Sequence, residues 1–356
     1  MPIFSADYLK RAGIAIFKGA GAPDDEAEIV MRLLVKANLV GHDSHGVIRI
    51  PQYIHLIQHG DLHPGIAIEI VKETPSTAVI NGNWGFGQVI ASKAMEIAIQ
   101  KAKTHSVSTV GAHHSNHVGR MADYAIMAAE ENMIGMVMVN NHGAAQHVAP
   151  YGGKERRLST NPICFAVPTG RKETSASQTT AEPLVVDITT SVVAEGKVRV
   201  ARNRGQSIPE GWIIDTDGKP STNPADLYAD PPGAILPFGG IVAHKGFGLS
   251  LMVDILTGTI SNAGFSRANP PRIGNAVFLT VINISSFMPI EEYLEQVDAF
   301  IEYVKSSKPM PGFDEVLVPG EPETRMEKKR LAEGIFVEDE TWKQINDAAK
   351  SVGVIL

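Results

Sequence analysis

The 356 residues combine 44% hydrophobic with 20% charged side chains, a composition typical of a folded globular protein that excludes an intrinsically disordered chain. The net charge of −7 argues against a nucleic-acid-binding protein, whose binding face is usually basic. No run of about eighteen apolar residues occurs, so we expect no membrane-spanning segment.

Helices are predicted for residues 1–70. Pro23 and the three acidic residues after it predict a helix start, because acidic side chains favour the positive end of the helix dipole. Gly41 predicts the end of this helix. A second helix is expected over residues 47–59, with Gly60 as its cap.

The middle of the chain alternates between short apolar strands and helices. Strands are expected at residues 66–70, 77–80, 107–112, 134–139, 184–186 and 276–282, and helices at 89–103, 118–131, 245–261 and 290–305. This order indicates an α/β layer with a partly parallel sheet. Residues 215–218 (DTDG) predict a hairpin turn. The end of the chain is polar and helical, at 321–333 and 339–351.

Residues 171–182, from Arg171 to Glu182, are rich in Ser, Thr and Gln and predict a solvated loop. No Pro- or Gly-rich linker separates independent domains, so we expect interwoven lobes.

Cysteine usage bears on the compartment. Cys164 is the only cysteine, so it cannot form an internal disulfide, which fits a reducing environment. Its apolar neighbours predict a buried strand position and not a nucleophile. Residues 1–10 lack a basic start followed by an apolar core, so no secretory signal is expected. We therefore predict a cytoplasmic protein.

The glycine fingerprint of a Rossmann domain is missing. The nearest candidate, GFGQVI at residues 85–90, has Ile90 where helix–strand packing requires Gly or Ala. No acidic residue follows it at the expected distance of about twenty residues. The glycines at 246–248 beside Lys245 fail equally, and the phosphate-loop pattern is absent.

Two short segments are dense in reactive side chains. Residues 41–49 (GHDSHGVIR) join two predicted helices, and Arg49 in a first helical turn suits bidentate binding of a carboxylate. Residues 113–120 (HHSNHVGR) follow an apolar strand and open a helix, which places them at the carboxyl edge of a sheet, where ligands of α/β proteins bind.

Structural interpretations of these residues stay open. Ser44 and Asp43 also suit helix caps, and Arg49 also suits an exposed surface. His113 and His117 have the spacing of a helical zinc pair, but residues 111–116 predict a loop and no acidic residue or cysteine cluster supports a metal. Spacing alone therefore indicates a polar cleft and no particular reaction.

At these segments the sequence resembles the malate/L-lactate dehydrogenase family that is distinct from the Rossmann lactate and malate dehydrogenases. The matching segments occur in the family's order over nearly the whole chain: 37–53, 114–120, 159–162 (STNP), 187–191 (DITTS), 218–224, 244–249 (HKGFGL) and 318–321 (VPGE). Within the family, the chain looks most like the bacterial hydroxycarboxylate dehydrogenases of the B type.

The resemblance implies a non-Rossmann α/β fold with a mixed sheet that binds NAD or NADP. It implies a helical lobe of residues 1–75 with 300–356, and a cofactor-binding lobe of residues 76–299 with an inserted substrate and dimer segment around 114–150. A homodimer with its active site near the subunit interface is expected. Relatives interconvert 2-hydroxy and 2-oxo acids such as malate, lactate, sulfolactate and ureidoglycolate, and some reduce cyclic imino acids.

Roles follow from the matched positions. His117 matches the proton-transferring histidine, and Arg49 matches the arginine that binds the substrate carboxylate. Ser44, His45 and Asp187 match a hydrogen-bonded set that assists proton movement. The positions that match contacts to the dinucleotide are His45, Gly119, Arg120, Asp187, Ile188, Thr189, Thr190, His244, Lys245, Asn275, Pro319, Gly320 and Glu321.

Departures from the family pattern also occur. Ser159 replaces a common Gly, Thr189 replaces a common Ala, and the loop at 171–182 looks longer than in relatives. The sequence leaves open the identity of the 2-oxo acid, which includes aromatic ones, and the choice between NAD and NADP. A metal-dependent hydrolase or lyase using His113, His114 and His117 is the competing hypothesis, and a binding module without catalysis is a third.

Overall fold

The computed structural model describes residues 2–142, 146–171, 182–268 and 272–356. The helices are α1 (Ala6–Gly19), α2 (Asp24–Leu39), α3 (Ile50–Gln58), α4 (Gly87–His105), α5 (Ala122–Glu130), α6 (Glu195–Asn203), α7 (His244–Asp254), α8 (Ile290–Lys305), α9 (Glu321–Glu333) and α10 (Asp339–Ser351). The strands are β1 (Ile3–Phe4), β2 (Glu69–Glu73), β3 (Thr77–Asn81), β4 (Val107–Ser115), β5 (Met133–His142), β6 (Ile163–Val167), β7 (Leu184–Ile188), β8 (Ile213–Ile214), β9 (Pro220–Ser221), β10 (Ala234–Ile235), β11 (Gly274–Asn283) and β12 (Ile335–Phe336). No helix in this described part of the chain has both the length and the apolar character needed to cross a bilayer.

Seven strands form a central mixed sheet in the order β2-β3-β4-β11-β5-β6-β7. Among these described strands, β3 and β4 make the one parallel pair, and the other neighbours are antiparallel. Strand β11 lies between β4 and β5 and is antiparallel to both, so β4 and β5 run in the same direction. The α/β class with a mixed sheet is thus confirmed.

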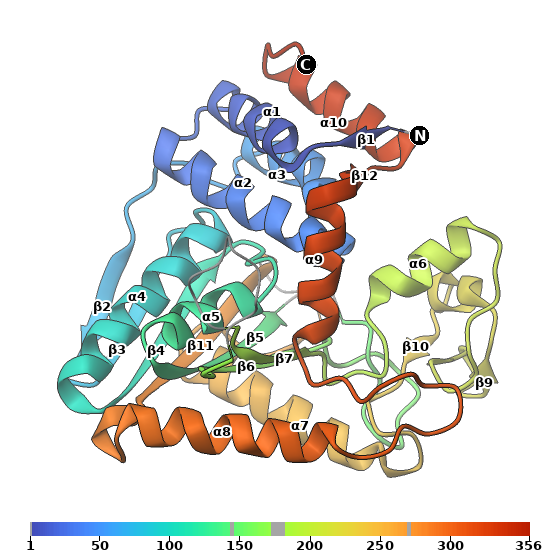
Figure 1. The fold of residues 1–356 in the computed structure, drawn as a ribbon. Helices are drawn as coiled ribbons and strands as arrows, with labels where there is room; N and C mark the ends of the chain where they lie inside the picture. The colour runs from blue at the N-terminus through green and yellow to red at the C-terminus, as the bar shows by residue number, and fades with distance from the viewer. Residues whose placement is uncertain (1, 143–145, 172–181, 269–271) are drawn as a thin grey trace.

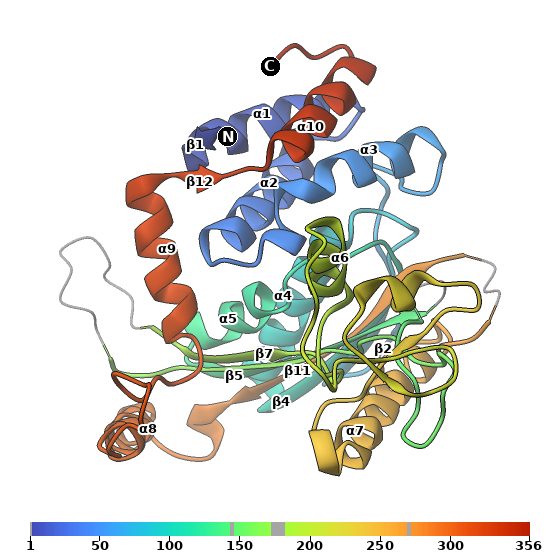
Figure 2. The ribbon, with the colours of Figure 1, turned by 90° about the vertical axis from the view of Figure 1, so that its right-hand side faces the viewer.

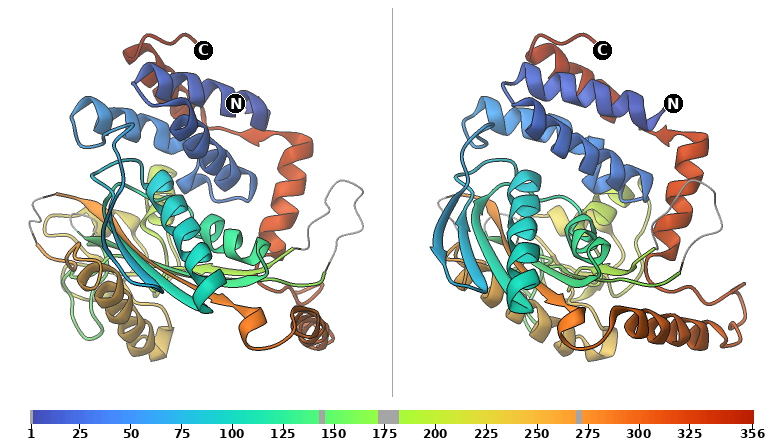
Figure 3. Two further views of the ribbon diagram at one scale, coloured as in Figure 1. Left: turned by 90° about the vertical axis from the view of Figure 1, so that its left-hand side faces the viewer. Right: turned by 60° about the vertical axis from the view of Figure 1, so that its left-hand side comes forward.

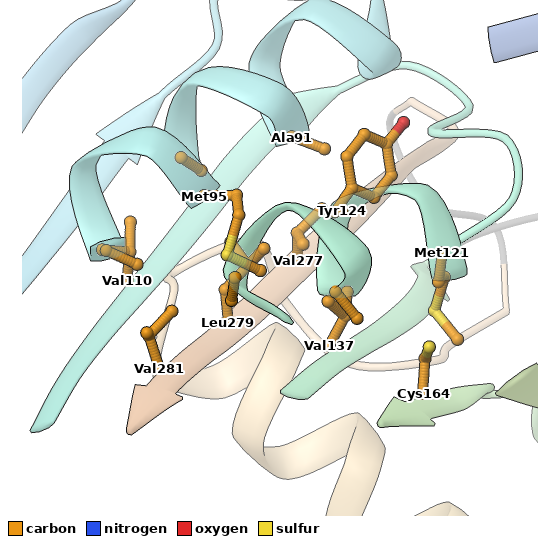
Figure 4. Packing of buried hydrophobic residues seen from close by; sticks show 14 of the residues in the cluster. Ala91, Met95, Val110, Met121, Tyr124, Val137, Cys164, Val277, Leu279 and Val281 are labelled. Atoms are coloured by element: carbon orange, nitrogen blue, oxygen red, sulfur yellow. The ribbon is translucent and has the colours of Figure 1, made fainter. Parts of the chain in front are cut away.

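Helices α4 and α5 cover one face of the sheet, and α7 and α8 lie on the other (Figure 2). The main core lies between the sheet and the first pair of helices, where Met95 of α4 and Tyr124 of α5 pack over Val277 of β11 (Figure 4). Cys164 of β6 is fully buried beside this core, which confirms that it is a buried strand residue.

Both chain ends contribute to a helical layer above α4 (Figure 1). Phe17 and Tyr53 share a buried cluster with Ile345 of α10, and β1 pairs with β12 through Ile3 and Phe336. The helical lobe built from both ends is therefore confirmed. Helix α9 connects this layer to the far side of the sheet, where α8 lies (Figure 3). The lobe boundary expected at residue 300 falls inside α8, whereas the chain passes between the layers along α9.

A small three-stranded sheet, β10-β8-β9, and α6 form a separate cluster beside the main sheet. The predicted hairpin turn is confirmed, because β8 and β9 are antiparallel and Asp215 N donates to Lys219 O at 2.9 Å. Gly218 in this turn has φ of +86°, which favours glycine.

Some predicted boundaries were wrong. The strand expected at 66–70 begins only at Glu69. Ile70 pairs with Ile80 of β3, whereas Ile68 precedes the strand and packs partly against the core. The helix expected at 118–131 begins at Ala122, and residues 111–116, expected as a loop, continue β4 up to Ser115. Helix α7 ends at Asp254 and is followed by a π-helical turn, Ile255–Thr259. The loop predicted at 171–182 lies, for residues 172–181, outside the described residues.

Candidate active site

His117 lies on the segment between β4 and α5, and hydrogen bonds hold this segment on two sides. On one side, the Asn116 side chain donates to Trp84 O at 2.8 Å. On the other, Val118 N donates to Oδ1 of Asn275 at 3.0 Å. A β-bulge where β4 faces β11, opposite Ala276, turns the chain just before this segment.

The first turn of α4 packs directly on the backbone of His117. A Cβ on Gly87 would lie 2.3 Å from the carbonyl oxygens of Asn116 and His117, far inside van der Waals contact. Glycine is therefore required at this position by close approach. The GFG segment that failed as a Rossmann fingerprint serves to seat His117 against α4.

The His117 ring contacts two other side chains of the helical layer. Its Nδ1 lies 2.7 Å from the Tyr53 hydroxyl, and the His45 ring stacks on it with 5.5 Å between centroids and 27° between planes. The amide end of Gln88 also lies within hydrogen-bond distance of the Tyr53 hydroxyl, with 2.7 Å between Nε2 and the hydroxyl oxygen. These contacts join α3, α4 and the segment after β4 at one point.

Two short 3-10 turns present Ser44, His45 and Arg49 to His117. Ser44 Oγ lies 2.9 Å from Nδ1 of His45, and Arg49 Nε donates to Ser44 O at 2.7 Å. Arg49 Nη1 donates to Gln52 at 2.7 Å. The turns are anchored by Asn38, whose Oδ1 accepts from Val47 N at 2.8 Å. Arg49 is thus held within electrostatic reach of the two imidazoles.

Burial and positive charge keep both imidazoles neutral. Desolvation, followed by the charges of Arg49 and His45, lowers the pKa of His117 well below 6.5. Desolvation, followed by Arg49, lowers the pKa of His45 to about 3. Burial raises the pKa of Tyr53 to about 12, so its hydroxyl keeps its proton. At neutral pH, the site therefore offers uncharged imidazoles next to a guanidinium.

Asp187 lies apart from the Ser44–His45 pair. Its Oδ2 accepts from Ala122 N at 2.9 Å, at the start of α5, and within the described residues no hydrogen bond joins it to Ser44 or His45. Burial raises its pKa, while Arg120 opposes the shift. Arg120 in turn forms a buried pair with Asp123 at 2.8 Å. The structure thus places Asp187 and Arg120 at the positive end of α5.

Several positions expected to contact a dinucleotide lie on strand β7, directly after it, or in hydrogen-bond contact with it. Pro319 O accepts from Val185 N near its start, at 3.3 Å. At its end, the Thr190 hydroxyl donates to Thr160 O and Asn161 O, both at 2.9 Å. Ile188 is 45% exposed.

Three further candidate positions, Thr189, His244 and Lys245, adjoin the end of β7. Thr189 Oγ1 donates to Ser191 O at 2.9 Å. Phe238 N donates to Thr190 O at 3.0 Å, and Phe238 packs closely on Gly246. The exposed residues His244 and Lys245, in the first turn of α7, therefore lie near this end of the strand.

Two candidate positions are occupied by internal contacts, and two glycines shape turns. Asn275 uses both ends of its amide, since Oδ1 accepts from Val118 N and Nδ2 donates to Asn140 O at 3.2 Å. The Glu321 carboxylate binds Lys305 at 2.6 Å and Arg171 at 2.8 Å. Its pKa is about 2 because hydrogen bonds from these two cations outweigh desolvation. Gly320, with φ of +98°, and Gly119, with φ of +76°, shape their turns.

The histidines of the competing metal hypothesis are used differently. The His113 ring makes an edge contact with His114, and His114 stacks on Trp84, whereas His117 contacts His45 and Tyr53. Within the described residues, no three His, Cys, Asp or Glu side chains are grouped to hold a metal ion.

Comparison with known proteins decides the family. The model of the family described as malate/L-lactate dehydrogenase matches residues 4–346. The chain belongs to the malate/L-lactate dehydrogenase family. Malate dehydrogenase from Pyrococcus horikoshii is 41% identical over 351 residues, which are 96% of this chain and 93% of that protein. Hydroxycarboxylate dehydrogenase B from Escherichia coli K12 is 35% identical over 356 residues, with 99% and 94% covered. The solved sulfolactate dehydrogenase from Methanocaldococcus jannaschii superposes with a TM-score of 0.88 at 36% identity, over 99% of this chain and 98% of that one.

The family resemblance of the sequence is thus confirmed, and the chain is a dehydrogenase. Two residues of the site in this malate/L-lactate dehydrogenase family member were missed by sequence reasoning. Tyr53 ends a segment that matched the family, but nothing in its spacing indicated contact with His117. Gln88 belongs to the failed glycine motif, and only the packing of α4 on His117 reveals its place.

Proposed function

We propose that this enzyme interconverts a small 2-hydroxy acid and its 2-oxo acid with NAD or NADP, using His117 as the acid/base and Arg49 as the carboxylate clamp. The observation that carries the proposal is the neutral His117 imidazole, packed between His45 and Tyr53 and within electrostatic reach of the Arg49 guanidinium. An anion clamp beside an uncharged base is what oxidation of a hydroxy acid requires.

Arg49 binds the substrate carboxylate and so fixes the neighbouring C2 carbon near His117. In oxidation, the imidazole accepts the hydroxyl proton, and in reduction the imidazolium returns it to the carbonyl oxygen. A bound carboxylate also neutralises the charge of Arg49, which lowers the pKa of His117 more than any other effect except burial. Substrate binding therefore makes the His117 imidazole more basic in the complex in which it accepts the hydroxyl proton.

The described residues fit a dinucleotide. The exposed Lys245 side chain offers positive charge to a phosphate, and the first turn of the eleven-residue helix α7, which also carries the exposed His244, offers backbone N–H groups. Thr189 and the exposed Ile188 provide a neighbouring surface at the end of β7. When bound, the nicotinamide supplies or accepts the hydride. Ser44 and His45 border the proton-transfer position, and Asp187 accepts a hydrogen bond from Ala122 N at the start of α5.

The test is an absorbance screen at 340 nm of NADH and NADPH against 2-oxo acids, including malate-type, lactate-type, sulfonated and aromatic ones. We expect one cofactor–acid pair to be turned over, and His117→Ala to lower kcat by about 10²–10⁴-fold. Full turnover by His117→Ala, or no oxidation of either cofactor with any acid, would contradict the proposal. Adding a cyclic imino acid to the panel separates imine reduction, the alternative within the family.

A homodimer in the cytoplasm completes the proposal. An apolar surface runs along residues 238–260, and it includes Ile241, whose side chain is 98% exposed. Other exposed members of this surface are Phe238, Val242, Leu251, Met252, Ile255 and Ile260. Several large apolar side chains exposed within one segment are typical of a subunit interface. It adjoins His244 and Lys245, so a partner seated here would lie close to the cofactor positions.

A further inference from the structure

The side chain of Gln88 is buried directly behind the proton-transferring histidine. It is 1% exposed and projects from the first turn of α4, the turn that packs on the backbone of His117. Its Nε2 lies 2.7 Å from the Tyr53 hydroxyl, and that hydroxyl lies 2.7 Å from Nδ1 of His117. Its other amide atom, Oε1, is buried without a hydrogen-bond partner among the described residues.

The three groups share a limited number of protons. The Tyr53 hydroxyl has one proton to donate, and desolvation keeps that proton in place. If the amide nitrogen of Gln88 donates to this hydroxyl, the tyrosine proton must point to Nδ1 of His117. The neutral imidazole then carries its own proton on Nε2, the ring nitrogen that faces away from Tyr53. In this form Nε2 is a hydrogen-bond donor and cannot act as a base.

Turning the Gln88 amide by 180° reverses this chain of hydrogen bonds. Amide oxygen and nitrogen occupy nearly the same volume, so their assignment follows from the hydrogen bonds. With the oxygen toward Tyr53, the tyrosine donates to Gln88 and its oxygen accepts from Nδ1–H of His117. The Nε2 lone pair is then free to accept a proton. Either orientation of the Gln88 amide leaves one of its two ends without a partner. The two orientations therefore differ only in which nitrogen of His117 carries the proton.

We propose that Gln88 is a positioning residue, which turns its amide oxygen toward Tyr53 and thereby holds the proton of His117 on Nδ1. The inference rests on the proposed function of His117. Both catalytic forms of the imidazole, the neutral base and the imidazolium, require a proton on Nδ1. One fixed orientation of Gln88 therefore serves oxidation and reduction alike, and only Nε2 gains or loses a proton during turnover.

The direct test is nitrogen NMR of the protein labelled with ¹⁵N-histidine, in which protonated and unprotonated ring nitrogens differ widely in chemical shift. The His117 signals are assigned by their loss in His117→Gln. We expect the wild-type protein at neutral pH to carry the proton on Nδ1, and Gln88→Met to move a substantial fraction to Nε2. A wild-type signal with the proton on Nε2, or the same tautomer in Gln88→Met, would overturn the inference.

Kinetics provide a second readout. Gln88→Met should lower kcat by about 10²-fold with a much smaller change in KM, because the base is misoriented while the Arg49 clamp is intact. Gln88→Glu keeps an acceptor for Tyr53, so it should retain the Nδ1 tautomer, recover most of kcat and move the acid limb of the pH profile to higher pH. Gln100→Met, on the exposed side of the same helix, is the matched control and should match wild type.

The results of these experiments distinguish failure of the Gln88 inference from failure of the proposed function. If Gln88→Met does not fold, the wild-type tautomer and the Gln88→Glu pH profile decide the matter, and an unshifted profile in Gln88→Glu contradicts the inference. If wild type turns over 2-oxo acids and His117→Ala does not, the proposed function stands whatever the Gln88 variants do. If His117→Ala remains fully active, the proposed function fails first.

Discussion

Replacing Gly87 with alanine tests whether the placement of His117 depends on the close approach of α4. The new Cβ would lie 2.3 Å from the carbonyl oxygens of Asn116 and His117, whereas ordinary contact begins near 3.4 Å. Both neighbours are backbone atoms, so the segment carrying His117 or the start of α4 must move by about 1 Å. A misplacement of that size costs about 10²-fold in the rate of a positioned reaction.

The assay compares kcat and the thermal unfolding midpoint of Gly87→Ala with those of Gly248→Ala. Gly248 lies inside α7, where an added Cβ meets nothing within 4 Å, so alanine there should stabilise the helix by roughly 0.5–1 kcal/mol. We expect Gly87→Ala to lose about two orders of magnitude in kcat. Wild-type kcat in a folded Gly87→Ala enzyme would refute the reasoning that this contact positions the imidazole.

Four further predictions concern the pH profile, the clamp, the core and the dimer. Because the pKa of His117 lies well below 6.5, kcat/KM for oxidation should stay constant as the pH falls to 6.5 and should decline only at lower pH. The reverse reaction, reduction, should become faster at acidic pH. An inflection above pH 6.5 in the profile for oxidation argues against a neutral imidazole in the free enzyme. Arg49→Gln removes a charge that lowers the pKa of His117, so kcat/KM should fall and the inflection of its pH profile should move to higher pH. An inflection at the wild-type pH would show that Arg49 does not act on His117. Asp254→Ala removes a carboxylate that accepts hydrogen bonds from the buried amide nitrogens of Asn140 and Asn161 and from the half-buried Ser266 hydroxyl. It should cost about 1–3 kcal/mol in denaturant unfolding, and an unchanged stability would contradict this reasoning. Ile241→Glu should reduce the mass measured by light scattering from dimer to monomer, and an unchanged dimer would place the interface elsewhere.

The histidines and the arginine were accessible from sequence because their motifs are local. Residues 41–49 and 113–120 each sit at a junction between elements, and apolar periodicity located those elements to within a few residues. Helices α8, α9 and α10 were predicted at their observed bounds, since each is bordered by a strong start or stop signal and has a polar face. The mixed sheet followed from the order of its strands.

Other features depend on contacts between residues far apart in the chain. Insertion of β11 between β4 and β5 is a pairing over more than 130 residues, and no local pattern encodes its register. Residues 118–121 had a helical apolar pattern but lie outside α5, because Val118 N is used by the side chain of Asn275 and Gly119 has φ of +76°. Asp187 was grouped with Ser44 and His45, yet its hydrogen bond is to the start of α5.

The sequence by itself determined which side chains are chemically capable: an imidazole at 117, a guanidinium at 49, and the elements that carry them. The tertiary structure alone decided the state of that imidazole, because burial, the neighbouring cation and the hydrogen bond to Tyr53 all come from elements distant in the chain. Residue type is a local property, whereas desolvation and hydrogen-bond partners exist only after α3, α4 and the end of β4 have packed together.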